Sequence, residues 1–144
     1  MRLSEGFVSS GDGTEGGGIT RVADGRASVF DSRSGLPGDS AGDLFEASDG
    51  TVWAGMDRGL ASIKAGRLRA FTGGKLGSLY VSAIAEDDES LILATADLNL
   101  YRFRDGRLSP YDLRLSATSG SAGTRYVFSM LRDTEGTLWF AMTA

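Results

Sequence analysis

A repeat of about 40 residues constrains the fold of this chain more than any other feature of its sequence. Similar turn sequences recur at intervals of 41 and 40 residues: Asp24-Gly25-Arg26, Ala65-Gly66-Arg67 and Asp105-Gly106-Arg107. Five residues before each turn stands an apolar residue: Ile19, Leu60 and Leu100. Five residues after each glycine stands an aromatic one: Phe30, Phe71 and Tyr111. A register kept over two periods indicates one structural unit used repeatedly.

Each unit contains four short apolar runs. In the second unit they are Leu44–Ala47, Thr51–Gly55, Leu60–Lys64 and Leu68–Phe71, and in the third Val81–Ala85, Leu91–Thr95, Leu98–Phe103 and Arg107–Tyr111. Asp-Gly or Ala-Gly between such runs is typical of tight hairpins, since primed turns need positive φ. One helix per unit is the alternative, for example at Tyr80–Glu86, but no window of 11 residues shows clean 3.6-residue periodicity. Four strands in about 40 residues therefore predict an all-β fold, a partial β-propeller of four-stranded antiparallel blades.

The repeat divides the chain into about three blade equivalents within a single domain, 1–144. We expect an incomplete blade at 1–30, whole blades at 40–72 and 80–113, and an incomplete blade at 124–144. Closed propellers typically have four to eight blades, so such an arc leaves sheet faces and strand edges unpaired. We expect them to be covered by the remaining blades of a longer chain or by a second copy that closes the ring. The apolar strand at Leu138–Met142, close to the end of the sequence, favours the longer chain.

The composition excludes several classes of function. The chain has no Cys and no His, so it has no disulfide, zinc–thiolate or imidazole metal site and no Ser-His-Asp triad. The chain has 15 basic and 19 acidic side chains, so its net charge is −4. The basic residues are scattered and do not form the stripe that is typical of a nucleic-acid-binding protein. No apolar run approaches the roughly 18 residues of a membrane span, and the first residues lack the apolar core of a signal peptide. We therefore expect that the protein is not an enzyme, that it binds no cofactor, and that this segment does not contact a membrane.

Three motifs carry a family resemblance. They are Gly35-Leu36-Pro37, the nearly intact Asp133-Thr134-Glu135-Gly136-Thr137-Leu138-Trp139-Phe140-Ala141, and its shorter form Asp49-Gly50-Thr51-Val52-Trp53-Ala54-Gly55. As a set they resemble the two-component regulator propeller repeat. The third unit departs from it, because Ile92 replaces the tryptophan and Leu98-Asn99-Leu100 replaces Gly-Leu. The resemblance implies the periplasmic sensor region of a bacterial hybrid histidine kinase or related regulator, non-catalytic and binding a ligand that is often a carbohydrate. The alternative is a self-assembling propeller scaffold with no small-molecule ligand.

The strand order indicates where a ligand would bind. If the first strand of each blade runs away from one face, the connections after the second and fourth strands both return to that face, and such loops usually carry binding sites. These loops hold Glu15, Arg33, Asp57, Arg58, Lys75, Tyr80, Asp97, Arg125 and Tyr126. Aromatic, guanidinium and carboxylate groups together suit a polar small molecule or oligosaccharide, although a solvated loop surface is the simpler interpretation of any one residue. The turns on the opposite face are expected to be inert.

Two further sets of residues favour structural interpretations. Trp53 and Trp139 lie in the strand register of the repeat, so we expect both to pack between blades rather than to stack on a ligand. Four acidic residues could suggest calcium, namely Asp24, Asp49, Asp105 and Asp133. Turn chemistry accounts for them better, because Asp favours the position before a turn glycine, and we expect no metal site.

Overall fold

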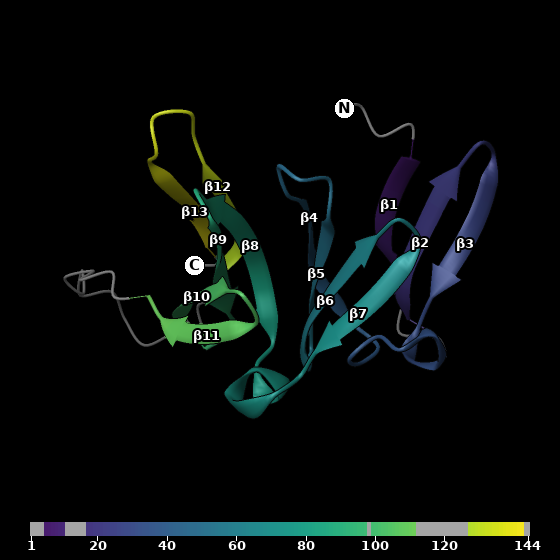
Figure 1. The fold of residues 1–144 in the computed structure, drawn as a ribbon, viewed down its shortest axis with the longest axis horizontal. Coiled ribbons are helices and arrows are strands. Elements are labelled where there is room, and N and C mark those ends of the chain that lie inside the picture. The colour runs from purple at the N-terminus through teal and green to yellow at the C-terminus, as the bar shows by residue number, and fades with distance from the viewer. Residues whose placement is uncertain (1–4, 11–16, 98, 112–126, 143–144) are drawn as a thin grey trace.

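Four antiparallel sheets make up the fold of the computed structural model, which describes residues 5–10, 17–97, 99–111 and 127–142 (Figure 1). Blade 1 contains β1 (Glu5–Ser10), β2 (Gly18–Ala23) and β3 (Arg26–Phe30). Blade 2 contains β4 (Ala41–Glu46), β5 (Val52–Met56), β6 (Gly59–Lys64) and β7 (Arg67–Phe71). Blade 3 contains β8 (Val81–Asp87), β9 (Ser90–Thr95), β10 (Leu100–Arg104) and β11 (Arg107–Pro110), and blade 4 contains β12 (Val127–Arg132) and β13 (Leu138–Met142). The expectation of an all-β partial propeller with four-stranded blades is confirmed.

Strands that follow one another in the chain also lie next to one another in each sheet. Two 3₁₀ helices, η1 (Ser32–Ser34) and η2 (Gly74–Ser78), lie in the connections from blade 1 to blade 2 and from blade 2 to blade 3. A helix was the alternative for Tyr80–Glu86, but Val81 onwards belongs to β8. The first five residues of this strand are buried. Within the described ranges, no helix is long and apolar enough to cross a membrane.

The repeated glycine turns join the last two strands of blades 1, 2 and 3. In the turn between β6 and β7, Ala65 has φ 51° and Gly66 has φ 74°. Asp24 and Asp105, with the glycines that follow them, take nearly the same angles. Two consecutive positive φ angles define the type I′ turn, whose twist matches that of the flanking strands. The hairpins predicted from the sequence are therefore present, and their turn residues have the positive φ angles that were expected.

Two strands begin two or more residues away from their predicted starts. The first strand of blade 2 was expected at Leu44–Ala47, but β4 begins at Ala41. The third strand of blade 3 was expected at Leu98–Phe103, but β10 begins at Leu100. The carbonyl of Asn99 accepts a hydrogen bond from the backbone N–H of Thr95 at 3.0 Å. This bond closes a turn after β9, so the chain enters the next strand later than its apolar pattern indicates.

The blades are arranged as a fan around their first strands, and β8 lies between β4 and β12 (Figure 1). Two hydrogen bonds join blade 2 to blade 3 near these strands: the backbone N–H of Ile84 donates to Asp43 Oδ2 at 2.9 Å, and that of Ser48 donates to Glu86 Oε2 at 2.9 Å. Gly55 permits the close approach of the two sheets, because a Cβ there would lie 2.5 Å from the carbonyl oxygen of Val81.

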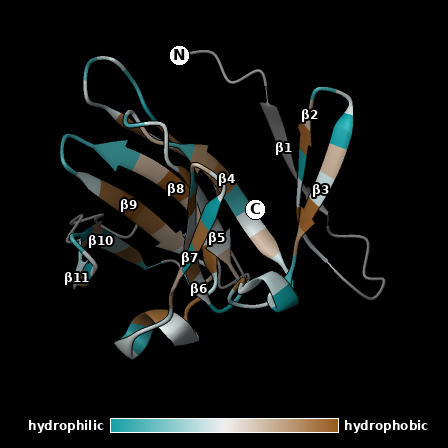
Figure 2. Cartoon of the chain, turned by 45° about the vertical axis from the view of Figure 1, so that its right-hand side comes forward, coloured by the Kyte–Doolittle hydropathy of each residue, from teal (hydrophilic) through white to brown (hydrophobic). Residues whose placement is uncertain are grey.

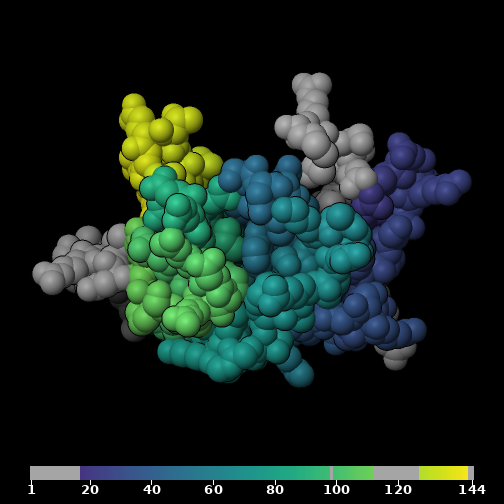
Figure 3. Space-filling model, in the orientation of Figure 1, coloured from purple at the N-terminus to yellow at the C-terminus, as the bar shows by residue number. Residues whose placement is uncertain are grey.

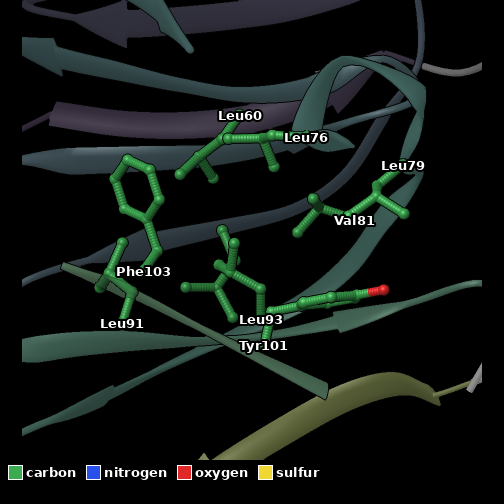
Figure 4. Close-up of a cluster of buried hydrophobic side chains, with 9 residues drawn as sticks. Leu60, Leu76, Leu79, Val81, Leu91, Leu93, Tyr101 and Phe103 are labelled. Atoms are coloured by element: carbon green, nitrogen blue, oxygen red, sulfur yellow. The ribbon is translucent and has the colours of Figure 1, made fainter. Parts of the chain in front are cut away.

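The largest of the three described hydrophobic clusters lies between blades 2 and 3. Figure 4 shows leucine, valine and aromatic side chains from β6, η2, β8, β9 and β10 meeting there, and Leu60, Val81 and Leu93 are completely buried. Trp53 lies in contact with Phe71 of its own blade and Phe103 of the next, with ring centroids 5.5 and 5.8 Å apart. Trp53 thus packs between blades as expected. More generally, hydrophobic residues lie mainly in the strands, and hydrophilic residues lie mainly in the turns (Figure 2).

Smaller cores fill the other two seams. Ile19 of β2 packs with Met56 and Ile63 between blades 1 and 2, and Ile92 of β9 packs with Val127 and Met130 between blades 3 and 4. In the third unit Ile92 therefore takes the place between blades that Trp53 has in the second. The side chains at each seam come from one face of each of the two adjoining sheets. Blades 2 and 3 are therefore each covered on both faces.

Trp139 does not pack between blades in the described chain, and that expectation was wrong. Its side chain is 60% exposed, and its indole N–H donates to Asp133 Oδ2 at 3.0 Å. The cause is the alternation of side chains along β13. Leu138 and Phe140 face blade 3, so Trp139 faces the other side, where no described blade lies.

Candidate functional site

Among the described residues, the connections predicted to carry a ligand site lie together on one side of the sheets, which we call the loop side. Asp57, after β5, donates its backbone N–H to the carbonyl of Ser40 in the connection from blade 1, at 3.0 Å. Gly59 donates in the same way to Leu79 in the connection to blade 3, at 3.0 Å. Ala96, after β9, donates to the carbonyl of Tyr80 at 3.0 Å. Backbone hydrogen bonds thus join loops that are distant in sequence into one surface.

Six of the nine predicted site residues belong to this described surface. Arg33 is in η1, Asp57 and Arg58 are in the β5–β6 turn, Lys75 is in η2, Tyr80 directly precedes β8, and Asp97 is in the β9–β10 turn. The other three, Glu15, Arg125 and Tyr126, lie outside the described residues.

Lys75 lies over the ring of Tyr101, and the charge of Asp97 acts on it from the β9–β10 turn. The Nζ atom of Lys75 lies 5.2 Å from the centroid of that ring. A side-chain hydrogen bond to Tyr101 raises the pKa of Lys75, and the negative charge of Asp97 adds to this effect. The hydroxyl of Thr95 donates to Asp97 Oδ1 and lowers the pKa of that carboxyl group. At neutral pH this cluster therefore presents an ammonium group, a carboxylate and an aromatic ring.

Tyr80 stands beside this cluster. Its backbone is hydrogen-bonded to the turn that contains Asp97, and its side chain is partly exposed. A Cβ on Gly42 would lie 3.0 Å from Tyr80 Cε1, so the ring packs closely against β4. The ring is thus supported by blade 2 while part of it stays accessible. We call Lys75, Tyr80, Asp97 and Tyr101 the loop-side cluster.

The remaining predicted residues do not join the cluster. The carboxylate of Asp57 accepts the backbone N–H of Ser40 at 3.4 Å, which fastens two loops together. Arg33 has a side chain that is 91% exposed and lies 4.0 Å from Asp31. Arg58 is exposed and makes no hydrogen bond or ion pair with any described residue. The structure therefore gathers three of the six described candidates and leaves three apart.

A cavity that the sequence did not predict opens beside the loop-side cluster. It has a volume of about 590 Å³ and lies between β7 and the outer strands of blade 3, lined by Arg69, Phe71, Lys75, Leu76, Tyr101 and Leu108 among others. Lys75 and Tyr101 thus belong both to the cluster and to the cavity wall. Only the repeated aromatic after each glycine turn, here Phe71, hints at this cavity in the sequence.

A second hollow lies on the opposite, turn side of the same seam. Its volume is about 480 Å³, and its walls include Trp53, Phe71 and Phe103, with Arg69, Arg104 and Glu89 among the polar residues around them. Arg104 is already paired with Glu89 at 2.6 Å, and the guanidinium of Arg69 lies 4.8 Å from the Phe71 ring centroid. The turn side, where the turns are expected to be inert, therefore also has a hollow.

Asp43 is a further group that sequence reasoning missed. Burial raises its pKa, although the backbone N–H of Ile84 donates to its carboxylate and opposes that effect. Nothing in the sequence distinguishes it from the acidic residues of the turns, because its burial depends on the approach of blade 3 to blade 2.

The turn aspartates satisfy the backbone, as turn chemistry predicted. Asp49 Oδ1 accepts from the backbone N–H of Thr51 at 2.9 Å. Asp133 Oδ1 accepts from Glu135 and Thr137, each at 2.9 Å. The bond from Thr51 lowers the pKa of Asp49, and the indole N–H of Trp139 is the main cause of the lowered pKa of Asp133.

The comparisons with known proteins bear on the fold. The sequence matches no protein-family model and no curated protein. The fold is similar to that of the extracellular domain of BT4673 from B. thetaiotaomicron, described in one crystal structure as a one-component system and in another as a hybrid two-component system. These alignments have TM-scores of 0.66 and 0.65 and 17% identity, and they cover 88% and 87% of this chain but only 18% and 17% of those chains.

A third crystal structure, of the extracellular domain of the hybrid two-component system BT3049 from the same organism, matches with a TM-score of 0.59. Its identity is 17%, and the alignment covers 85% of this chain and 16% of that one. The resemblance to two-component regulator propellers is therefore confirmed at the level of the fold. This chain spans less than a fifth of the length of these extracellular domains.

Proposed function

We propose that this chain is a non-catalytic, ligand-binding segment of a periplasmic sensor propeller in a bacterial two-component signalling protein. Its blades are similar in fold to extracellular domains of proteins described as hybrid two-component systems. The absence of His and Cys from the sequence removes the commonest general base and the thiol nucleophile, which favours binding over catalysis.

The loop-side cluster is the observation that carries this proposal. Lys75 and Tyr101 line a cavity of about 590 Å³, and the adjoining loop carries the carboxylate of Asp97 and the partly exposed ring of Tyr80. Ligand sites combine apolar walls with a few polar groups in this way. A sugar ring presents hydroxyl groups and an apolar face, so the ligand we propose is a polar small molecule such as an oligosaccharide. Glu15, Arg33, Asp57, Arg58, Arg125 and Tyr126 form the wider loop surface of the same proposal.

The alternative function is a propeller scaffold that assembles with itself and binds no small molecule. One observation favours it, namely the exposed apolar side chains on blades 1 and 4. The two functions differ in a simple respect, because only the sensor has a small ligand.

Thermal shift measurements with defined sugars test the proposal. We choose maltohexaose as a neutral probe and tetragalacturonate as an anionic probe that can pair with Lys75. At millimolar concentration at least one of them should raise the melting temperature, because a ligand that binds only the folded state stabilises it. Lys75→Ala and Asp97→Asn should reduce that rise, whereas Arg67→Ala, at the start of β7, should not. A melting temperature unchanged by both probes would reject the carbohydrate ligand and favour the scaffold.

A further inference from the structure

The cavity beside the loop-side cluster has positively charged walls. Among the described residues that line it, Arg69 and Lys75 are charged, and the others are apolar, glycine, threonine or tyrosine. They belong to β7, to η2 and the residues before it, and to β10, β11 and the turn between them. Blades 2 and 3 lie between blades 1 and 4 (Figure 3), and the two end blades supply none of the described wall.

Neither cation is neutralised by an ion pair. Arg69 and Lys75 form no salt bridge with a described carboxylate. Both arginines of β10, in contrast, are paired with carboxylates, at nitrogen–oxygen distances of 3.1 and 2.6 Å. Asp97 acts on the charge of Lys75 from outside the described lining, and its carboxylate already accepts the hydroxyl of Thr95. The described wall therefore carries two positive charges without an ion-pair partner among the described residues.

Aromatic rings of the wall hold both cations in place. The guanidinium carbon of Arg69 lies 4.8 Å from the centroid of the Phe71 ring, and the Nζ atom of Lys75 lies 5.2 Å from that of Tyr101. Attraction to the face of a ring orders a cation but leaves N–H donors available to a ligand. Tyr101 is buried with Leu76 in the core behind the cavity (Figure 4), so its ring is a fixed support.

An anionic ligand matches this wall. Ammonium and guanidinium groups form their strongest hydrogen bonds with ionised oxygen groups. The whole chain has a net charge of −4, so the attraction of an anion requires a local excess of positive charge such as this one. The apolar side chains of Phe71 and Leu108 in the same wall suit the apolar face of a sugar ring.

We propose that the cavity selects an acidic oligosaccharide, with carboxylate or sulfate groups of the sugar bound by Arg69 and Lys75. This inference rests on the proposed function, because it names the class of sugar that the same site binds. It also adds a specificity-determining residue to the site, since Arg69 lies on β7 and outside the loops in which site residues were predicted.

Calorimetric titration with matched sugars tests the charge of the ligand. Tetragalacturonate and its full methyl ester have the same rings, but the ester carries no negative charge. A sulfated carrageenan tetrasaccharide distinguishes sulfate from carboxylate, and maltohexaose is the neutral reference. At least one of the two acidic probes should bind about tenfold more tightly than the ester and maltohexaose, because charge-assisted hydrogen bonds are the stronger ones.

Matched variants test the two cations. Arg69→Gln and Lys75→Gln should each weaken binding of the acidic probe about tenfold, since hydrogen bonds to charged groups contribute most. Arg69→Lys keeps the charge and should retain most of the affinity. Arg67→Gln is the control, because it removes the same charge from the same strand but from a residue outside the described lining, and it should change the affinity little.

Ionic strength gives a test that needs no variant. Between about 0.01 M and about 0.15 M salt the Debye length falls from about 30 Å to about 8 Å, so the wild-type chain should bind the acidic probe more weakly at the higher concentration. The affinity for a neutral probe should not change.

Three results would overturn the acidic ligand: an ester that binds as tightly as the acid, an affinity for the acid that is independent of salt, or Arg69→Gln and Lys75→Gln variants that bind as Arg67→Gln does. If a neutral probe binds in such a case, the proposed function stands and only the charge of its ligand is wrong. If none of the four probes binds, the proposed carbohydrate ligand fails together with this inference.

Discussion

The two tryptophans occupy the same place in the repeat but have different surroundings, which gives a prediction at the scale of single residues. Trp53 contacts Phe71 and Phe103, so Trp53→Ala should lower the free energy of unfolding by about 3 kcal/mol. Trp139→Ala should lower it by less than about 1 kcal/mol, because that side chain is mostly exposed. Urea denaturation at a concentration where the chain is monomeric measures both values. Equal losses would show that Trp139 is buried within the single chain.

Asp43 gives a pH-dependent prediction. Burial raises the pKa of this carboxyl group above its usual value of 3.8, so the folded state prefers the protonated form. The resulting cost to stability is absent at low pH and develops as the pH rises through the raised pKa. Asp43→Asn should therefore be more stable than the wild type at pH 7, since the amide oxygen still accepts from Ile84. The difference should shrink below pH 4 in thermal melts, and a variant less stable than the wild type at pH 7 would contradict this account.

At the scale of elements, the hairpin between β6 and β7 contains an avoidable strain. Ala65 has φ 51°, in the left-handed region, where a residue with a Cβ costs about 1–2 kcal/mol. Asn tolerates that region and favours type I′ turns, so Ala65→Asn should raise the free energy of unfolding by about 1 kcal/mol. Asp105→Asn, at the corresponding turn of blade 3, is the control and should change stability little. Chemical denaturation compares the two, and a destabilised Ala65→Asn variant would mean that the turn depends on another contact.

The strands and hairpins were largely predictable from the sequence because each unit of the repeat contains similar turn residues and a similar apolar pattern. The spacing of Asp24, Ala65 and Asp105 identified three hairpins, and apolar alternation identified the strands around them. What the sequence could not predict depends on the approach of one blade to another. The burial of Asp43 and the cavity beside Lys75 arise at the seam between blades 2 and 3, and the exposure of Trp139 depends on which side of β13 has a neighbour.

The candidate site was predictable as a surface but not as a cluster. Strand order placed Lys75, Tyr80 and Asp97 on the same side of the sheets, and the structure confirms that their loops are joined there. The same argument gave equal weight to Arg33 and Arg58, which stand apart, because strand order does not specify how far each loop reaches. Tyr101 was missed since it lies within a strand and reaches the loop side only through its ring.

At the scale of the whole molecule, the fan of blades assigns different roles to its parts. The central blades 2 and 3 carry the loop-side cluster and the largest described core, and blades 1 and 4 flank them (Figures 1 and 3).

The central claim is that the loop side binds the ligand, and amide chemical shifts test it most directly. In ¹H–¹⁵N correlation spectra titrated with maltohexaose or tetragalacturonate, we expect shifts confined to residues 73–80, 95–97 and 99–101, which form or border the loop-side cluster. Lys75→Ala should weaken them, and Arg67→Ala should not. Shifts centred on the turn-side hollow, around Asp49 and Arg104, or no shifts with either probe, would contradict the claim.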